Sequence, residues 1–64
     1  MADYTRKVKT ILYENGCFFV RQGKGDHEIW HSTIRNRNFT VDGSITKRSS
    51  AIKTLKKAGI NKII

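Results

Sequence analysis

The order of its hydrophobic patterns is the feature that most limits how this chain can fold. Residues 4–15 carry apolar side chains at the three-to-four-residue spacing of an amphipathic helix, with basic residues on the other side. Residues 17–21, 27–32 and 38–41 are short runs rich in aromatic and β-branched side chains, separated by turn-forming residues, as expected for strands. Helical spacing returns over residues 49–58. The sequence therefore predicts an α+β fold in the order helix, three antiparallel strands, helix.

Capping residues set the expected ends of the helices. Asn15-Gly16 and Gly59 stand where a helix commonly ends in a left-handed residue. Ser49 or Ser50 is the expected N-cap of the second helix. With two helices and one sheet, both helices are expected to cover the same sheet face, which leaves the other face for solvent or a ligand.

The shortness of the chain limits it to one hydrophobic core. Chains of this size bury only about 60% of the surface that they expose when unfolded. The 64 residues include no proline, low-complexity tract or internal repeat, so we expect a single domain over residues 1–64. The one cysteine, Cys17, cannot form an internal disulfide, which favours a reducing, cytoplasmic location. The longest apolar run, residues 17–20, is far shorter than the roughly 20 residues of a membrane span, so the chain is not expected to cross or enter a membrane by itself.

Positive charge is concentrated in the second half of the chain. The formal net charge is +8, from 13 Lys and Arg against 5 Asp and Glu. From Arg35 onward there are eight basic residues and one acidic residue, Asp42. A field of one sign attracts polyanions, namely nucleic acid, an acidic membrane surface or an acidic protein. Charge alone does not choose among these three.

His27 is the first candidate for a catalytic residue. It opens an expected strand directly after a loop that contains Gly23 and Gly25, and glycines allow the close approach of a ligand. Histidine is the side chain whose proton equilibrium lies nearest neutrality, as acid or base chemistry at a phosphodiester requires. The plainer alternative is a solvated or structural histidine.

No metal site or cofactor is expected. His31 lies four residues beyond His27 on the same strand, about 13 Å away, which is too far for both to bind one metal ion. Cys17 lies in an apolar strand, where a buried thiol is usually inert. The segment Gly23-Lys24-Gly25 is too short for the phosphate-binding loop of nucleotide hydrolases.

Four aromatic residues could stack on unpaired bases if they were exposed: Phe18, Phe19, Trp30 and Phe39. Because so small a domain needs most of its aromatic side chains in the core, we expect Phe19 and Phe39 to be buried. The positions of Phe18 and Trp30 stay open.

Three segments of the chain match a known pattern in order and in spacing. They are GCFFVRQGKGDHEIW over residues 16–30, Phe39-Thr40-Val41, and LKKAGI over residues 55–60. Together they resemble the HicA toxin family of bacterial and archaeal toxin–antitoxin modules, over nearly the whole chain. The most specific part is the glycine-containing segment that ends in Asp26-His27 and is followed by the aromatic Trp30.

The resemblance implies a fold like that of the double-stranded-RNA-binding domain. It also implies the toxin of a type II toxin–antitoxin system, a ribosome-independent mRNA interferase with mRNA as substrate, neutralised by an acidic HicB-type antitoxin. The essential histidine of the family matches His27. Many members have a proline and a second histidine after the third strand, whereas here Val41 runs into Asp42-Gly43, so the role of that later histidine does not carry over.

For such an RNA endonuclease, we expect His27 to take the proton from a ribose 2′-hydroxyl that attacks the adjacent phosphorus. Arg21 and Lys24 are candidates to stabilise the charge that develops on the phosphoryl oxygens. Lys24, His31 or water could protonate the leaving group. The RNA strand is expected to be held through its phosphates by Arg35, Arg37, Lys47 and Arg48.

Two other classes of function fit the same sequence. One is a non-catalytic basic module that binds RNA or DNA and uses His27 only as a contact. The other is a protein whose basic face serves only to dock an acidic partner chain.

Overall fold

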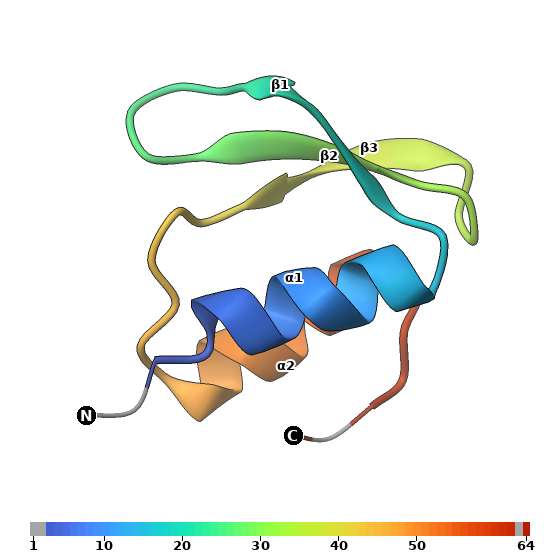
Figure 1. The fold of residues 1–64 in the computed structure, drawn as a ribbon. Helices are drawn as coiled ribbons and strands as arrows, with labels where there is room; N and C mark the ends of the chain where they lie inside the picture. Colours follow the sequence, from blue (N-terminus) through green and yellow to red (C-terminus); the bar gives the residue numbers. More distant parts are fainter. Residues whose placement is uncertain (1–2, 63) are drawn as a thin grey trace.

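The computed structural model describes residues 3–62 and 64, and it has the expected order of elements (Figure 1). The sheet lies on one side and both helices cover the same face of it. The α+β prediction is therefore confirmed. The helices are α1 (Thr5–Glu14) and α2 (Arg48–Lys57), and the strands are β1 (Phe18–Gln22), β2 (Glu28–Ser32) and β3 (Arg37–Val41).

The three strands form an antiparallel sheet in the order β1-β2-β3, so β1 and β3 are its two edges. Trp30 at the centre of β2 lies opposite Phe39 on β3 and Phe19 on β1. The pairing of β2 with β3 is regular over five consecutive residue pairs. The pairing of β1 with β2 shifts register between Phe19 and Arg21, as at a β-bulge.

The core lies between the sheet and the helices. The largest fully buried side chains include Trp30 from β2, Leu12 from α1 and Leu55 from α2. Cys17 is buried just before β1 and carries a free thiol, as expected. The described residues include no helix that is long and apolar enough to cross a membrane.

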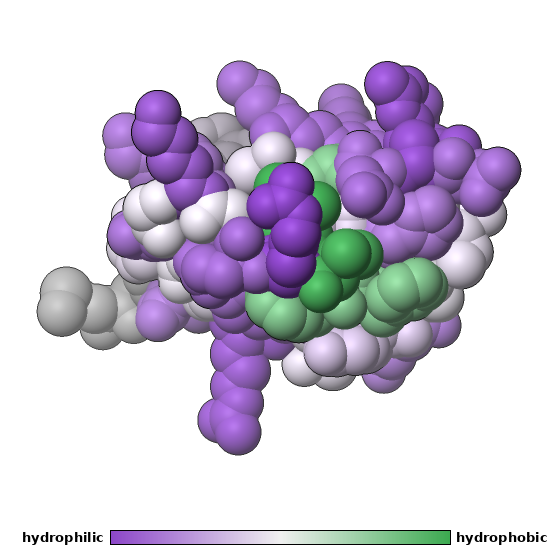
Figure 2. All heavy atoms as spheres, turned by 90° about the horizontal axis from the view of Figure 1, so that it is seen from above, coloured by the Kyte–Doolittle hydropathy of each residue, from purple (hydrophilic) through white to green (hydrophobic). Residues whose placement is uncertain are grey.

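The expected burial of the aromatic residues is confirmed for Phe39 but is wrong for Phe19. The Phe19 side chain stands on the edge strand β1, all five residues of which are exposed, and it is 43% accessible. Its ring stands nearly perpendicular to the buried Trp30 ring (86°), with centroids 6.3 Å apart. With the exposed neighbours Phe18 and Val20, Phe19 leaves three consecutive apolar residues at the surface. Seen from above the sheet, an apolar area stands among hydrophilic residues (Figure 2).

The predicted serine cap of α2 is also wrong. The helix begins at Arg48, its N-cap is Lys47, and no side chain caps it. Ser50 already lies inside the helix, where its carbonyl accepts a hydrogen bond from the Thr54 hydroxyl (2.9 Å). The expected helix ends are confirmed, because Gly16 and Gly59 both have a φ of +87°.

Candidate functional site

His27 and Asp42 lie side by side at one end of the sheet. The Nε2 atom of His27 is 3.3 Å from Oδ1 of Asp42, and the two side chains are 55% and 52% exposed. Glu28 and Val41 form the last pair of the β2–β3 ladder at this end of the sheet. His27 precedes Glu28 and Asp42 follows Val41, so these two residues face each other just beyond the ladder. The imidazole of His27 is therefore both open to solvent and next to a carboxylate.

The loop before His27 is fixed by hydrogen bonds within it. The Gly23 N–H donates to the His27 carbonyl (2.8 Å), and the His27 N–H donates to the Lys24 carbonyl (3.1 Å). The Gln22 side chain donates from Nε2 to the carbonyls of His27 (3.0 Å) and Gly25 (3.1 Å). These bonds hold the backbone of His27 in one place.

The two loop glycines have different surroundings. A Cβ atom at Gly23 would lie 3.0 Å from the carbonyl oxygen of His27, so a side chain there would crowd the loop. A Cβ atom at Gly25 would meet nothing within 4 Å. Only Gly25 therefore leaves open space for a ligand.

The turn that carries Asp42 packs against the loop that carries His27. A side chain at Gly43 would collide with the backbone carbonyl and the Cβ atom of Asp26. The absence of a side chain at Gly43 lets these two segments touch. This contact brings the backbone at His27 and the backbone at Asp42 close together.

Glu28 anchors the strand that follows His27. Its carboxylate accepts hydrogen bonds from Trp30 Nε1 (2.9 Å) and from Lys9 Nζ (3.2 Å) on α1. The indole hydrogen bond, aided by the Lys9 ammonium, lowers the pKa of the Glu28 carboxyl, although burial of the group acts in the opposite direction. Glu28 thus joins the start of β2 to the helix beneath it.

Arg21 and Lys24 belong to the same hairpin as His27. Arg21 on β1 pairs with Ile29 on β2, and Ile29 lies two residues after His27 in the sequence. Lys24 is part of the hydrogen-bonded loop. Both side chains are exposed. His31 is further along β2, where its Nδ1 atom lies 2.8 Å from Asn38 Oδ1 and its ring packs against Phe18.

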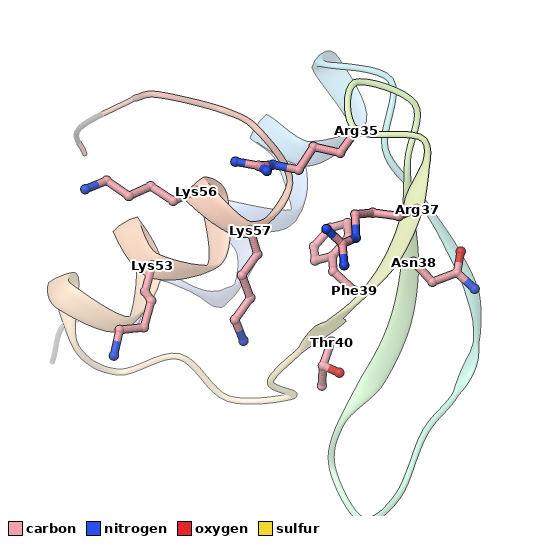
Figure 3. A pocket seen from close by; sticks show the side chains of 8 residues that line it. All are labelled: Arg35, Arg37, Asn38, Phe39, Thr40, Lys53, Lys56 and Lys57. Atoms are coloured by element: carbon pink, nitrogen blue, oxygen red, sulfur yellow. The ribbon is translucent and has the colours of Figure 1, made fainter.

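A second candidate region is an open groove between the edge strand β3 and helix α2, which we call the β3–α2 groove (Figure 3). Its volume is about 570 Å³, and its lining contains no acidic residue. Arg35 and Arg37 extend from the strand side toward the helix, and the side chain of Lys57 lies between the helix and the strand (Figure 3). The basic residues of the groove are Arg35, Arg37, Lys53, Lys56 and Lys57.

The residues expected to hold RNA are only partly brought together. Arg35 and Arg37 lie in the β3–α2 groove, whereas Lys47 and Arg48 stand at the beginning of α2 and do not line it. The Arg48 guanidinium instead donates a hydrogen bond to the backbone carbonyl of Ile64.

Sequence reasoning missed Asp42 and the three lysines of α2. Asp42 has a recognisable signal, since it is the one acidic residue after Arg35 and begins a turn directly after a strand. Lys53, Lys56 and Lys57 follow the i, i+3, i+4 spacing that places side chains on one helix face. Only the packing of α2 beside β3 shows that this face lines a groove.

No group of three His, Cys, Asp or Glu side chains in the described part of the chain is arranged to hold a metal ion. No protein-family model, curated protein or solved structure significantly matches this chain.

Proposed function

We propose that this protein is an RNA endonuclease of the HicA type, which cleaves mRNA with His27 as general base. The observation that carries the proposal is the exposed His27 imidazole 3.3 Å from Asp42, after a hydrogen-bonded loop that is open at Gly25. The order of helices and strands agrees with the fold that the sequence resemblance implies. The surplus of basic residues suits a polyanionic substrate.

In the proposed reaction, His27 takes the proton of a ribose 2′-hydroxyl, and the 2′-oxygen forms a bond to the adjacent phosphorus. The bond from phosphorus to the 5′-oxygen of the next nucleotide then breaks. The products are a 2′,3′-cyclic phosphate and a 5′-hydroxyl, which gains one proton. Asp42 would hold the ring and stabilise the imidazolium that forms when His27 gains its proton.

Arg21 and Lys24 are the cations of the hairpin best placed to stabilise negative charge on the phosphoryl oxygens. Of the candidates for the leaving-group acid, His31 is unsuitable, because four strand residues place it about 13 Å from His27. It is also engaged with Asn38. Lys24 and a water molecule are the remaining candidates.

Arg35 and Arg37 would bind phosphates of the same RNA strand at the other end of β3. Phosphate contacts position a strand without specifying its sequence. We include in the proposal that an acidic HicB-type antitoxin neutralises the toxin by competing with RNA for this basic surface.

The test is cleavage of a defined single-stranded RNA by the purified protein, by its His27→Ala variant and by the matched control His31→Ala. We expect cleavage by the parent and by His31→Ala, and a loss of at least about 100-fold in His27→Ala, the low end of the contribution of a general base. A substrate with 2′-deoxyribose at the scissile position should resist cleavage. Undiminished cleavage by His27→Ala, or cleavage of the deoxy substrate, would refute the mechanism.

The β3–α2 groove also supports a second function, a non-catalytic module that binds nucleic acid, because two of its cations, Arg35 and Arg37, lie at the end of β3 opposite to His27. Such a protein would retard RNA in a gel without shortening it. If six phosphates are contacted, the affinity for a single strand should fall with a log–log salt slope of about −4. An affinity that does not change with salt would exclude RNA binding through this basic surface.

A further inference from the structure

The two edges of the sheet differ in how readily another strand could pair with them. The bulge between Phe19 and Arg21 interrupts β1, and bulges are one of the ways in which proteins block edge pairing. Strand β3 has no such interruption over Arg37–Val41. Because β3 pairs with β2 on one side only, its other side keeps unpaired backbone groups.

The free edge of β3 borders the β3–α2 groove. The lining of the groove includes consecutive strand residues 37–40 on one side and one face of α2 on the other. A groove between an edge strand and a helix can accept an extended peptide, which adds a strand to the sheet through main-chain hydrogen bonds. The groove therefore offers open space beside the unpaired backbone groups that a fourth strand requires.

The charge of the groove selects the kind of strand that could bind. In the part of the chain that the structure describes, none of its five basic side chains forms an ion pair with a carboxylate. A hollow of similar size beside α1 differs, since Asp3 and Glu14 line it together with its basic residues. A second copy of this chain, itself at +8, would be repelled from the β3–α2 groove. An acidic segment would neutralise it.

We propose that an extended acidic segment of a partner protein binds in the β3–α2 groove as a fourth strand beside β3. Its carboxylates face Lys53, Lys56 and Lys57, and its backbone pairs with residues 37–41. A peptide fits this edge better than RNA does, because its N–H and C=O groups repeat at the spacing of the free backbone groups of β3, whereas the hydroxyls and phosphates of RNA do not. The proposal does not depend on RNA cleavage.

The test uses an end-blocked eight-residue peptide that alternates Glu and Val. Binding is measured by calorimetry, and hydrogen exchange of the β3 amides is followed by NMR. We expect the peptide to bind and to slow exchange of edge amides within residues 37–41. The groove variant Lys53→Ala/Lys56→Ala/Lys57→Ala should bind at least 10-fold more weakly. The control variant Arg6→Ala/Lys7→Ala/Lys62→Ala, which removes three cations from the hollow beside α1, should change the affinity less than 3-fold.

Two N-methylated peptides separate strand pairing from simple ionic attraction. Each carries N-methyl groups at alternate residues, in one register or the other, and keeps every carboxylate. Because an added strand donates its hydrogen bonds from alternate residues, one of the two should lose at least 10-fold in affinity while the other is less affected.

Three results would overturn the proposal. They are equal affinity for all three peptides, no change in exchange of the β3 amides, or equal weakening by the groove and control variants. A ten-nucleotide RNA that binds with the same dependence on the three lysines, while the peptide does not bind, would assign the groove to RNA. Cleavage is not measured in this experiment, so its outcome is separate from that of the His27 test.

Discussion

His27 Nε2 and Asp42 Oδ1 lie 3.3 Å apart across the end of the β2–β3 ladder, although the two residues are separated by two strands in the sequence. A carboxylate beside an imidazole can orient the ring for proton transfer. The pair places a carboxylate beside the proposed general base, and its role can be tested without changing His27 itself.

Asp42→Asn should lower kcat for RNA cleavage by about 10-fold or more and leave KM within about 2-fold, because general base catalysis contributes about 10²–10⁴-fold and depends on orientation. Asp42→Glu, which keeps the charge, should recover part of the loss. The measurement is steady-state cleavage of a fluorescent RNA. An Asp42→Asn variant with the parent's kcat would show that Asp42 does not assist His27.

Gly43→Ala should damage the site through the backbone. The new Cβ atom would collide with Asp26, so the turn and the His27 loop must separate, at a cost of about 1–3 kcal/mol in the free energy of unfolding. Cleavage by the folded protein should fall as well. The control is Gly16→Ala at the other end of the β1–β2 pair from His27, which is costly through its positive φ, by about 1–2 kcal/mol, and through contact of the new Cβ atom with Thr33 Oγ1. We expect both variants to lose a comparable amount of stability in urea unfolding. Only Gly43→Ala is expected to lose cleavage activity.

The order of elements was predictable because each element carries its own local pattern. Val8, Ile11 and Leu12 follow the helical spacing and are buried as that spacing requires. The face of a strand residue was harder to predict where neighbours are all apolar, as in residues 17–20. Phe19 is exposed because β1 is an edge strand with a bulge, and neither property can be read from its own segment.

The candidate site was predictable where one residue type suggests the chemistry, and less so where residues must come together. His27 stands out by its type and by the glycines before it. The partnership with Asp42 depends on the register of β2 with β3, and the groove depends on α2 lying beside β3. Such contacts between distant segments follow from tertiary packing, which short-range patterns do not contain.

Two serine substitutions should have very different effects on stability. The fully buried Ser32 hydroxyl donates to the Ala58 carbonyl at the end of α2 (2.6 Å) and accepts from the Arg35 N–H (3.2 Å). Ser32→Ala leaves both groups without this partner and should cost about 1–3 kcal/mol. Ser49 is exposed and makes no capping bond, so Ser49→Ala should change stability by less than about 0.5 kcal/mol.

Urea unfolding, followed by circular dichroism, measures both variants. A cost near 1 kcal/mol for Ser49→Ala would mean that this serine caps α2 after all.

The bond between Glu28 and Trp30 should make stability depend on pH in the acid range. The pKa of Glu28 is lowered in the folded protein, first by the indole hydrogen bond and then by Lys9, so the folded state holds the carboxylate form more strongly than the unfolded state does. This contribution is complete above the ordinary Glu pKa of about 4.3. It is lost as the pH falls through the lower pKa of the folded state, because protonation then removes the charge that Trp30 and Lys9 stabilise.

Glu28→Gln should therefore be less stable than the parent at pH 7 and should lose less stability between about pH 5 and pH 3. Lys9→Met removes the weaker cause and keeps the indole bond, so most of the parent's pH dependence should remain. Unfolding in urea at several pH values, followed by the fluorescence of the buried single tryptophan, provides the measurement. If Glu28→Gln and the parent lost stability in parallel over this range, other carboxyl groups would be responsible for the acid sensitivity.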